Sequence, residues 1–266
     1  MPIRPMPIGA DTTSPYEIVW NGVMGTHTLT AIATDTSDNT AMAGNVTVFV
    51  ENPPPPMTCF VLQAQVSVHG RGAVTAPSFQ TAMPGETILA FVGTDGPAGA
   101  GKQTVTVSGG GLSWKLVRRA NARSGDAEVW AATASSVLTG VKVKSTPQRN
   151  GYDQDLTVIA MEGTTGVGTS ANASGASTAP SLKLTTSAPT SLIFAIGNDW
   201  DRAVARTLPE GWVSLDQWVD TQTGDTIWSQ YTNQPVAAAG TQVTVGDIAP
   251  TNDQWNLVAV ELPGED

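Results

Sequence analysis

The segment Ile88-Leu89-Ala90-Phe91-Val92-Gly93-Thr94-Asp95 returns later in the chain as Leu192-Ile193-Phe194-Ala195-Ile196-Gly197-Asn198-Asp199. Each copy is a short, unbroken apolar run with β-branched and aromatic residues, and each closes on glycine, a small polar residue and aspartate. A run of this kind is typical of a strand that is buried on both faces and then enters a turn. The sequence therefore predicts two equivalent central strands.

The match extends beyond these two strands. Gly125–Trp130 is echoed by Gly224–Trp228, and Tyr152–Asp155 is echoed by Asn252–Trp255. The matched residues lie roughly a hundred positions apart, so the pattern indicates a tandem duplication. We place its halves at about 73–163 and 180–263, and we interpret the Gly-, Ser- and Thr-rich stretch 163–179 as a connector that contributes no core strand.

Composition points to an all-β protein made of short strands. Charged residues make up only 14% of the chain, which also holds 27 glycines and 18 prolines. Turn-forming and β-branched residues favour strands joined by tight turns, and no stretch shows a sustained helical period. We expect a duplicated, jelly-roll-like β-sandwich of two sheets over residues 58–266, to which each half contributes about half of the strands.

The acidic balance of the chain excludes several classes of partner. The 13 basic residues stand against 23 acidic ones, which gives a formal net charge of −10. Nucleic acid and anionic membrane surfaces would repel such a chain, and no segment approaches the roughly 18 apolar residues of a membrane span. We therefore expect no nucleic-acid partner and no membrane insertion. Dispersed acid with little lysine suits a secreted or cell-surface protein, and calcium is the cofactor that it favours.

The first fifty residues carry a distinct pattern of strands and turns. Its elements are Pro15-Tyr16 with Trp20, then Gly25-Thr26-His27-Thr28-Leu29-Thr30-Ala31, then Ala33-Thr34-Asp35 with Asn39-Thr40-Ala41, and finally Val46–Val50. Over about residues 8–50, this pattern resembles the second half of the immunoglobulin-like repeats of secreted and surface bacterial proteins. The resemblance implies a truncated immunoglobulin-like domain over residues 1–50 of a longer modular protein. Because a half-domain leaves sheet edges unpaired, we expect it to pack on a neighbour, to self-associate through these edges or to fray.

A proline-rich linker, residues 51–57, follows this half-domain as Glu51-Asn52-Pro53-Pro54-Pro55-Pro56-Met57. Such a run is stiff and extended, so it marks a domain boundary. The region after it contains Trp114-Lys115-Leu116-Val117, Val129-Trp130 and Val258-Ala259-Val260-Glu261-Leu262. With the central strands, these segments resemble extracellular β-sandwich modules of secreted modular bacterial proteins and of phage tail-associated proteins. The resemblance implies an extracellular context rather than a particular activity.

Three carboxylates, Asp95, Asp199 and Asp201, come directly after the two central strands. Three interpretations of them stay open. They cap tight turns through their own hydrogen bonds, they bind calcium together with backbone carbonyl groups, or two of them act as the paired carboxylates of a glycosidase. If the duplication brings the equivalent loops together, Asp95, Asp199 and Asp201 are the candidate metal ligands.

The aromatic residue Trp200 stands in the polar loop between Asp199 and Asp201-Arg202. An indole flanked by carboxylates and a guanidinium suits stacking on a sugar ring, with hydrogen bonds to the sugar hydroxyls. Trp200, Asp199, Asp201 and Arg202 are therefore the candidate ligand-binding residues, and polysaccharide is the expected ligand. The alternative is that the indole of Trp200 folds back over the end of the sandwich.

Taken together, these patterns favour a non-catalytic binding or adhesion module of a secreted, multi-domain bacterial protein. The sequence has no Gly-x-Ser-x-Gly motif and its two histidines lie in or at the end of strand patterns, so we assign no catalytic residue. Two other functions stay open. One is a hydrolase, glycosidase-like or metal-assisted, that uses the loop-end carboxylates, and the other is a structural spacer or filament subunit.

Overall fold

The computed structural model describes residues 6–50 and 60–265. Those residues form strands, turns and bends without a helix, which confirms the all-β prediction. Accordingly, the described residues offer no helix that could cross a membrane. The chain divides into two compact units, Met1–Met57 and Thr58–Asp266, which we call the N-terminal unit and the C-terminal unit. The expected linker at 51–57 lies outside the described residues.

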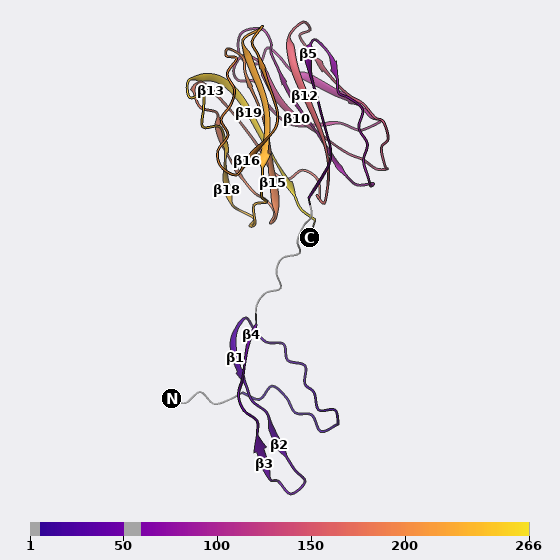
Figure 1. The fold of residues 1–266 in the computed structure, drawn as a ribbon, viewed down its shortest axis with the longest axis vertical. Helices are drawn as coiled ribbons and strands as arrows, with labels where there is room; N and C mark the ends of the chain where they lie inside the picture. The colour runs from indigo at the N-terminus through magenta and orange to yellow at the C-terminus, as the bar shows by residue number, and fades with distance from the viewer. Residues whose placement is uncertain (1–5, 51–59, 266) are drawn as a thin grey trace. The chain divides into compact units, whose positions relative to one another are not determined.

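The N-terminal unit consists of two separate two-stranded ribbons (Figure 1). In one, β1 (Gly25–Leu29) pairs antiparallel with β4 (Val46–Val50), and in the other β2 (Ile32–Thr34) pairs with β3 (Thr40–Met42). No described residue of this unit is buried. The ribbons therefore present their apolar side chains to solvent instead of enclosing a core.

The C-terminal unit forms four sheets, two from each half of the duplication. The first half contributes β5 (Val61–Arg71), β6 (Val74–Thr75), β7 (Thr87–Thr94), β8 (Val105–Gly109), β9 (Lys115–Ala120), β10 (Asp126–Thr133), β11 (Val143–Pro147) and β12 (Asp153–Glu162). The second half contributes β13 (Ser170–Thr178), β14 (Ser181–Thr185), β15 (Ser191–Asp199), β16 (Trp212–Asp220), β17 (Asp225–Thr232), β18 (Gln242–Gly246) and β19 (Asp253–Pro263). Both predicted central strands, β7 and β15, are present.

The larger sheets of the two halves have corresponding strand orders. The first is β5-β12-β7-β10-β9 and the second is β13-β19-β15-β17-β16. In both, the central strand lies between the last strand of its half and the strand that carries the Val-Trp or Ile-Trp pair. The smaller sheets are β6-β11-β8 in the first half and β14-β18 in the second. Each half thus repeats one arrangement of a large and a small sheet.

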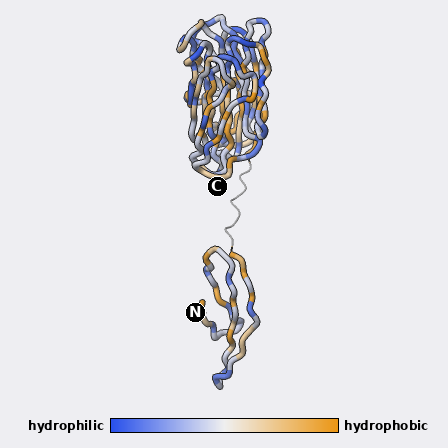
Figure 2. The backbone as a smooth tube through the Cα atoms, turned by 90° about the vertical axis from the view of Figure 1, so that its left-hand side faces the viewer, coloured by the Kyte–Doolittle hydropathy of each residue, from blue (hydrophilic) through white to orange (hydrophobic). Residues whose placement is uncertain are grey.

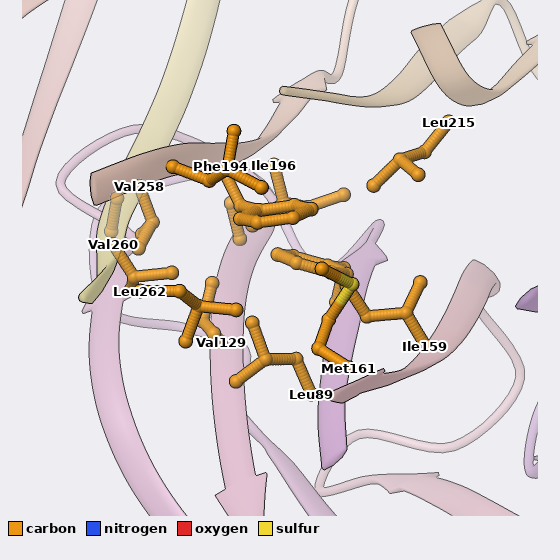
Figure 3. Packing of buried hydrophobic residues seen from close by; sticks show 14 of the residues in the cluster. Leu89, Val129, Ile159, Met161, Phe194, Ile196, Leu215, Val258, Val260 and Leu262 are labelled. Carbon is orange, nitrogen blue, oxygen red and sulfur yellow. The ribbon is translucent and has the colours of Figure 1, made fainter. Parts of the chain in front are cut away.

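Three apolar clusters place these sheets in layers. One cluster lies between the sheets of the first half, and a second lies between the sheets of the second half. The third joins the two five-stranded sheets to each other, and Figure 3 shows its side chains meeting from both halves. We call this contact the central interface. The C-terminal unit is therefore a pair of sandwiches packed on each other, which differs from the expected single two-sheet sandwich shared by both halves.

The central interface explains why β7 and β15 are apolar throughout. In β7, Leu89 and Phe91 face the central interface, while Ile88, Ala90 and Val92 face the smaller sheet of their own half. A strand with a hydrophobic core on each face has no solvent-facing position, so its residues do not alternate between apolar and polar. Every residue of β7 and β15 is buried, which confirms the prediction from the opening motif. In Figure 2 the backbone of this unit is orange along much of its strands.

The expectation that residues 163–179 contribute no core strand was wrong. Residues 170–178 form β13, which pairs with β19 from Ser170↔Val260 to Thr178↔Asp253. Packing requires glycine at one position of this strand, because a Cβ atom on Gly175 would lie 2.4 Å from the Trp255 ring. Residues 170–178 thus have the composition of a flexible connector, yet they form an edge strand that packs against the Trp255 indole.

Candidate functional site

Antiparallel pairing gathers acidic side chains at one end of the two large sheets. The central strands β7 and β15 end there, and their neighbours on both sides begin there. Each of these four neighbouring strands begins with an aspartate, namely Asp126, Asp153, Asp225 and Asp253. We call this region the acidic end. It also carries the loops in which Asp95 and Trp200 lie.

The side chain of Asp95 lies in the central interface and is only 6% exposed. It contacts Asp225 and Asn198, both from the second half. Burial, and next the Asp225 carboxylate, raise the pKa of Asp95 to about 10. A carboxyl group with this pKa keeps its proton at neutral pH, and in that form Asp95 can donate a hydrogen bond to Asp225 across the interface.

Asp199 belongs to a second cluster, inside the second half. Its carboxylate accepts a short hydrogen bond from Arg206, whose other terminal nitrogen lies 2.9 Å from Asp253 Oδ2. The Arg206 guanidinium also lies 4.4 Å from the centre of the Trp228 ring, and its side chain is 1% exposed. Burial first, and then the neighbouring Asp253, raise the pKa of Asp199 to about 8, whereas Arg206 opposes this rise. Asp199 and Asp253 thus hold the buried Arg206 side chain inside the second half, away from solvent.

Asp95 and Asp199 have different neighbours although the sequence match aligns them. The match pairs Phe91 with Ala195, but it is Phe194 that faces Phe91 across the central interface, with ring centres 6.0 Å apart. A displacement of one residue reverses the side-chain direction in a strand. Asp95 therefore faces the central interface, and Asp199 faces the interior of the second half. The structure brings Asp199 next to Asp201, but it does not add Asp95 to them.

The Trp200 loop lies at the surface of the acidic end. Trp200 is partly buried, and its Nε1 donates to Gly96 O at 3.0 Å, so the indole covers the loop that follows β7. Asp201 and Arg202 are exposed. Asp201 N donates to Asp199 Oδ1, and Arg202 Nη1 donates to Asn252 Oδ1. Gln254 N donates to Asp201 Oδ1 at 3.4 Å, and Arg202 Nε lies 3.4 Å from Asp253 Oδ1. The indole thus folds back over the β7 loop, and part of its ring stays exposed near the exposed Asp201 and Arg202 side chains.

Another carboxyl pair escaped the sequence analysis. Thr157 Oγ1 lies 3.4 Å from Asp155 Oδ2 and 3.5 Å from Asp216 Oδ2, so the hydroxyl joins β12 of the first half to β16 of the second. Burial, and then Asp216, raise the pKa of Asp155 well above its usual value. The sequence feature that could have identified Asp155 is its position directly before the apolar run Leu156–Met161. Since Asp155 is 1% exposed, it acts inside the interface rather than on a substrate.

The described residues contain no group of three or more His, Cys, Asp or Glu side chains arranged to hold a metal ion. The calcium expectation for Asp95, Asp199 and Asp201 therefore stays a prediction that depends on binding experiments. Comparisons with protein-family models, with curated proteins and with solved structures found no match. The resemblances to immunoglobulin-like repeats and to jelly-roll-like modules accordingly rest on the sequence patterns quoted above.

Proposed function

We propose that the C-terminal unit is a non-catalytic binding module of a secreted or cell-surface protein, and that polysaccharide binds at the Trp200 loop. The observation that carries this proposal is the arrangement of three side chains at the acidic end. A partly exposed indole lies in sequence beside the exposed carboxylate of Asp201 and the exposed guanidinium of Arg202. Hydrogen bonds hold all three residues: Trp200 bonds to Gly96 and Arg202 to Asn252 in neighbouring loops, and Asp201 N bonds to Asp199 at the end of β15.

This arrangement suits a sugar ring for two physical reasons. An indole offers an apolar face on which the C–H groups of a pyranose can stack, while Asp201 accepts and Arg202 donates hydrogen bonds to hydroxyl groups. The bond from Trp200 Nε1 to Gly96 O also fixes the ring before the ligand arrives. A preorganised side chain loses little conformational freedom on binding, so more of the contact energy contributes to affinity.

The loop-end carboxylates support binding over hydrolysis. A glycosidase needs two carboxyl groups that face the scissile bond from either side. Asp95 and Asp199 are 6% and 0% exposed, and their partners are Asp225, Arg206 and other protein groups. They are buried and engaged inside the fold, whereas Asp201 and Arg202 are exposed, so a ligand can reach them beside their protein partners.

Tryptophan fluorescence titrations of the full chain test the proposal. The ligands are soluble neutral glucans, mannans and polyuronates, each with and without EDTA and calcium. We expect saturable binding to at least one polysaccharide without turnover, and a loss of at least tenfold in affinity, about 1.4 kcal/mol, in Trp200→Ala. Trp200→Phe keeps a stacking ring and should lose less.

Trp114→Ala is the matched control for this experiment. Trp114 is also partly buried and donates its Nε1 hydrogen to a glycine carbonyl, Gly109 O, at 3.1 Å, but it lies in the first half between β8 and β9. It should bind polysaccharide as the wild type does. Equal losses in both variants, or hydrolysis that Asp199→Asn abolishes with the fold intact, would refute the proposal. The absence of binding to any polysaccharide would favour the spacer function.

A further inference from the structure

The N-terminal unit exposes apolar side chains that a folded domain normally covers. Along the paired strands, Ile32 and Met42 lie opposite each other and are 60% and 69% exposed. Phe49 and Val46 of β4 are 62% and 59% exposed. Of these residues Ile32 and Met42 are neighbours across the β2-β3 ribbon, and a neighbouring exposed apolar pair of this kind suits an interaction site.

Residues 28–32 of this unit present a free strand edge. Within the described residues, β1 pairs only with β4 and β2 only with β3, so each strand keeps one side without a neighbour. At the junction, Ala31 O accepts from Ala43 N, again on the side of the existing partners. Unpaired backbone groups along such an edge can accept an added strand.

A groove of about 640 Å³ runs beside this edge. Residues 28–32 line one side of it and residues 6–11 and 16–18 line much of the rest. The large aliphatic residues of its lining are Met6, Ile8, Ile18, Leu29, Ile32 and Met42. The groove falls within the size range of ligand sites in proteins, and it lies next to backbone groups that lack strand partners.

The charges around the groove indicate what kind of segment fits it. Asp11 and Glu17 belong to its lining, and residues 6–50 contain four carboxylates but neither lysine nor arginine. A basic partner is therefore attracted to this unit, whereas a second copy of it would bring like charges together. Charge complementarity favours a cationic partner over self-association.

We propose that this groove binds an extended segment of a partner protein in which apolar and polar residues alternate and Lys or Arg residues flank the apolar ones. The segment adds as a third strand along residues 28–32. Alternate apolar side chains enter the groove beside Ile32 and Met42, and the flanking cations face Asp11 and Glu17. An added strand also converts a two-stranded ribbon, which is marginal by itself, into a three-stranded sheet. This site is independent of the Trp200 loop.

Fluorescence anisotropy of labelled peptides with the full chain tests the proposal. The probe is Lys-Thr-Val-Thr-Val-Thr-Val-Lys, and its matched control carries Glu at both ends. We expect saturable binding of the basic peptide and at least tenfold weaker binding of the acidic one. Ile32→Ser should weaken binding of the basic peptide at least tenfold, and Glu17→Gln should weaken it several-fold and reduce its salt dependence.

Val23→Ser is the control variant, because Val23 is 74% exposed and lies outside the groove lining. It should bind the basic peptide normally. Since Ile32 and Val23 are both exposed, neither substitution removes a core contact, and circular dichroism checks the fold. Equal affinity for the two peptides, equal effects of the two serine substitutions, or no binding would overturn the proposal. A concentration-dependent dimer that Ile32→Ser dissociates would replace it with self-association.

Discussion

Glu261 is an acidic residue near the C-terminal end of the last strand, β19, and it is 0% exposed. Thr169 N donates to its carboxylate at 2.8 Å, Ser187 Oγ at 2.7 Å and Ser191 Oγ at 2.8 Å. Burial opposes ionisation, but these hydrogen bonds together lower the pKa of Glu261 to about 2. The carboxylate thereby ties β19 to the loops before β13 and before β15.

Replacing Glu261 with glutamine should destabilise the C-terminal unit. The amide removes a charge that several donors surround and turns part of an acceptor into a donor, so we expect a loss of about 1.5–3 kcal/mol in the free energy of unfolding. Urea unfolding at pH 7 measures it. Since the folded pKa lies below the unfolded one, this contribution is present above about pH 4.5 and is lost as pH falls towards 2. A difference between variant and wild type that persists unchanged at pH 2 would contradict this account.

The residue scale also explains why the sequence could locate the Trp200 loop but not its geometry. Asn198-Asp199-Trp200-Asp201-Arg202 stands out because no alternation explains an indole there. Whether the ring covers the fold or faces solvent depends on Gly96, which lies on the other half of the duplication. That contact is set by the packing of the two halves, which the local sequence does not encode.

At the scale of elements, carboxyl pairs join strands of the two halves. Asp95 follows β7 and contacts Asp225 at the start of β17, while Asp155 of β12 lies beside Asp216 of β16. His69 of β5 stacks on Trp218 of β16, with ring centres 4.5 Å apart. The central interface thus has an apolar middle. It also contains Asp95 and Asp155, whose raised pKa values favour the protonated form.

These pairs predict that the C-terminal unit is less stable in alkali than in mild acid. The folded pKa values of Asp95 and Asp155 are raised, so the folded state binds more protons than the unfolded state above about pH 4. The free energy of unfolding should therefore fall as pH rises, by about 1.4 kcal/mol per pH unit for each group that stays protonated. Thermal unfolding between pH 5 and 9 measures this slope.

Asp95→Asn keeps a hydrogen-bond donor and removes the titration. It should flatten the pH dependence and raise the melting temperature at pH 9. Glu210→Gln, at an exposed position, is the matched control and should keep the wild-type slope. Melting temperatures that rise from pH 5 to pH 9 in the wild type would be incompatible with protonated carboxyl groups in the interface.

The positions of strands were easier to predict from the sequence than the way in which the sheets pack on one another. Runs such as Leu192–Ile196 identify strands because their residues are β-branched, aromatic and closed by a turn. The same runs cannot assign a face, since both faces of β15 are buried. The one-residue displacement between Phe91 and Phe194 is likewise invisible in an alignment, yet it sends Asp95 and Asp199 to different cores. The sequence analysis missed the edge strand β13 because its residues are small and have a low strand propensity. At Gly175 the small size is explained by the Trp255 ring that packs there.

At the scale of the whole molecule, the two units differ in whether they bury their apolar residues. The C-terminal unit buries its central strands on both faces through three clusters. The N-terminal unit buries none of its described residues. The C-terminal unit therefore encloses its own hydrophobic core, whereas the described residues of the N-terminal unit leave their apolar side chains exposed. The two proposals, a polysaccharide at the Trp200 loop and an added strand on the N-terminal unit, concern these two units separately.

The central claim is that polysaccharide binds at the Trp200 loop, and hydrogen exchange of the full chain locates such a site most directly. Amide exchange is measured by mass spectrometry with and without the soluble polysaccharide that changes the tryptophan fluorescence. The account predicts slower exchange at residues 199–202 and in the adjoining loop at 252–254, with the strands of both sandwiches unchanged. Protection confined to any other surface, or no change at residues 199–202 under saturating ligand, would contradict it.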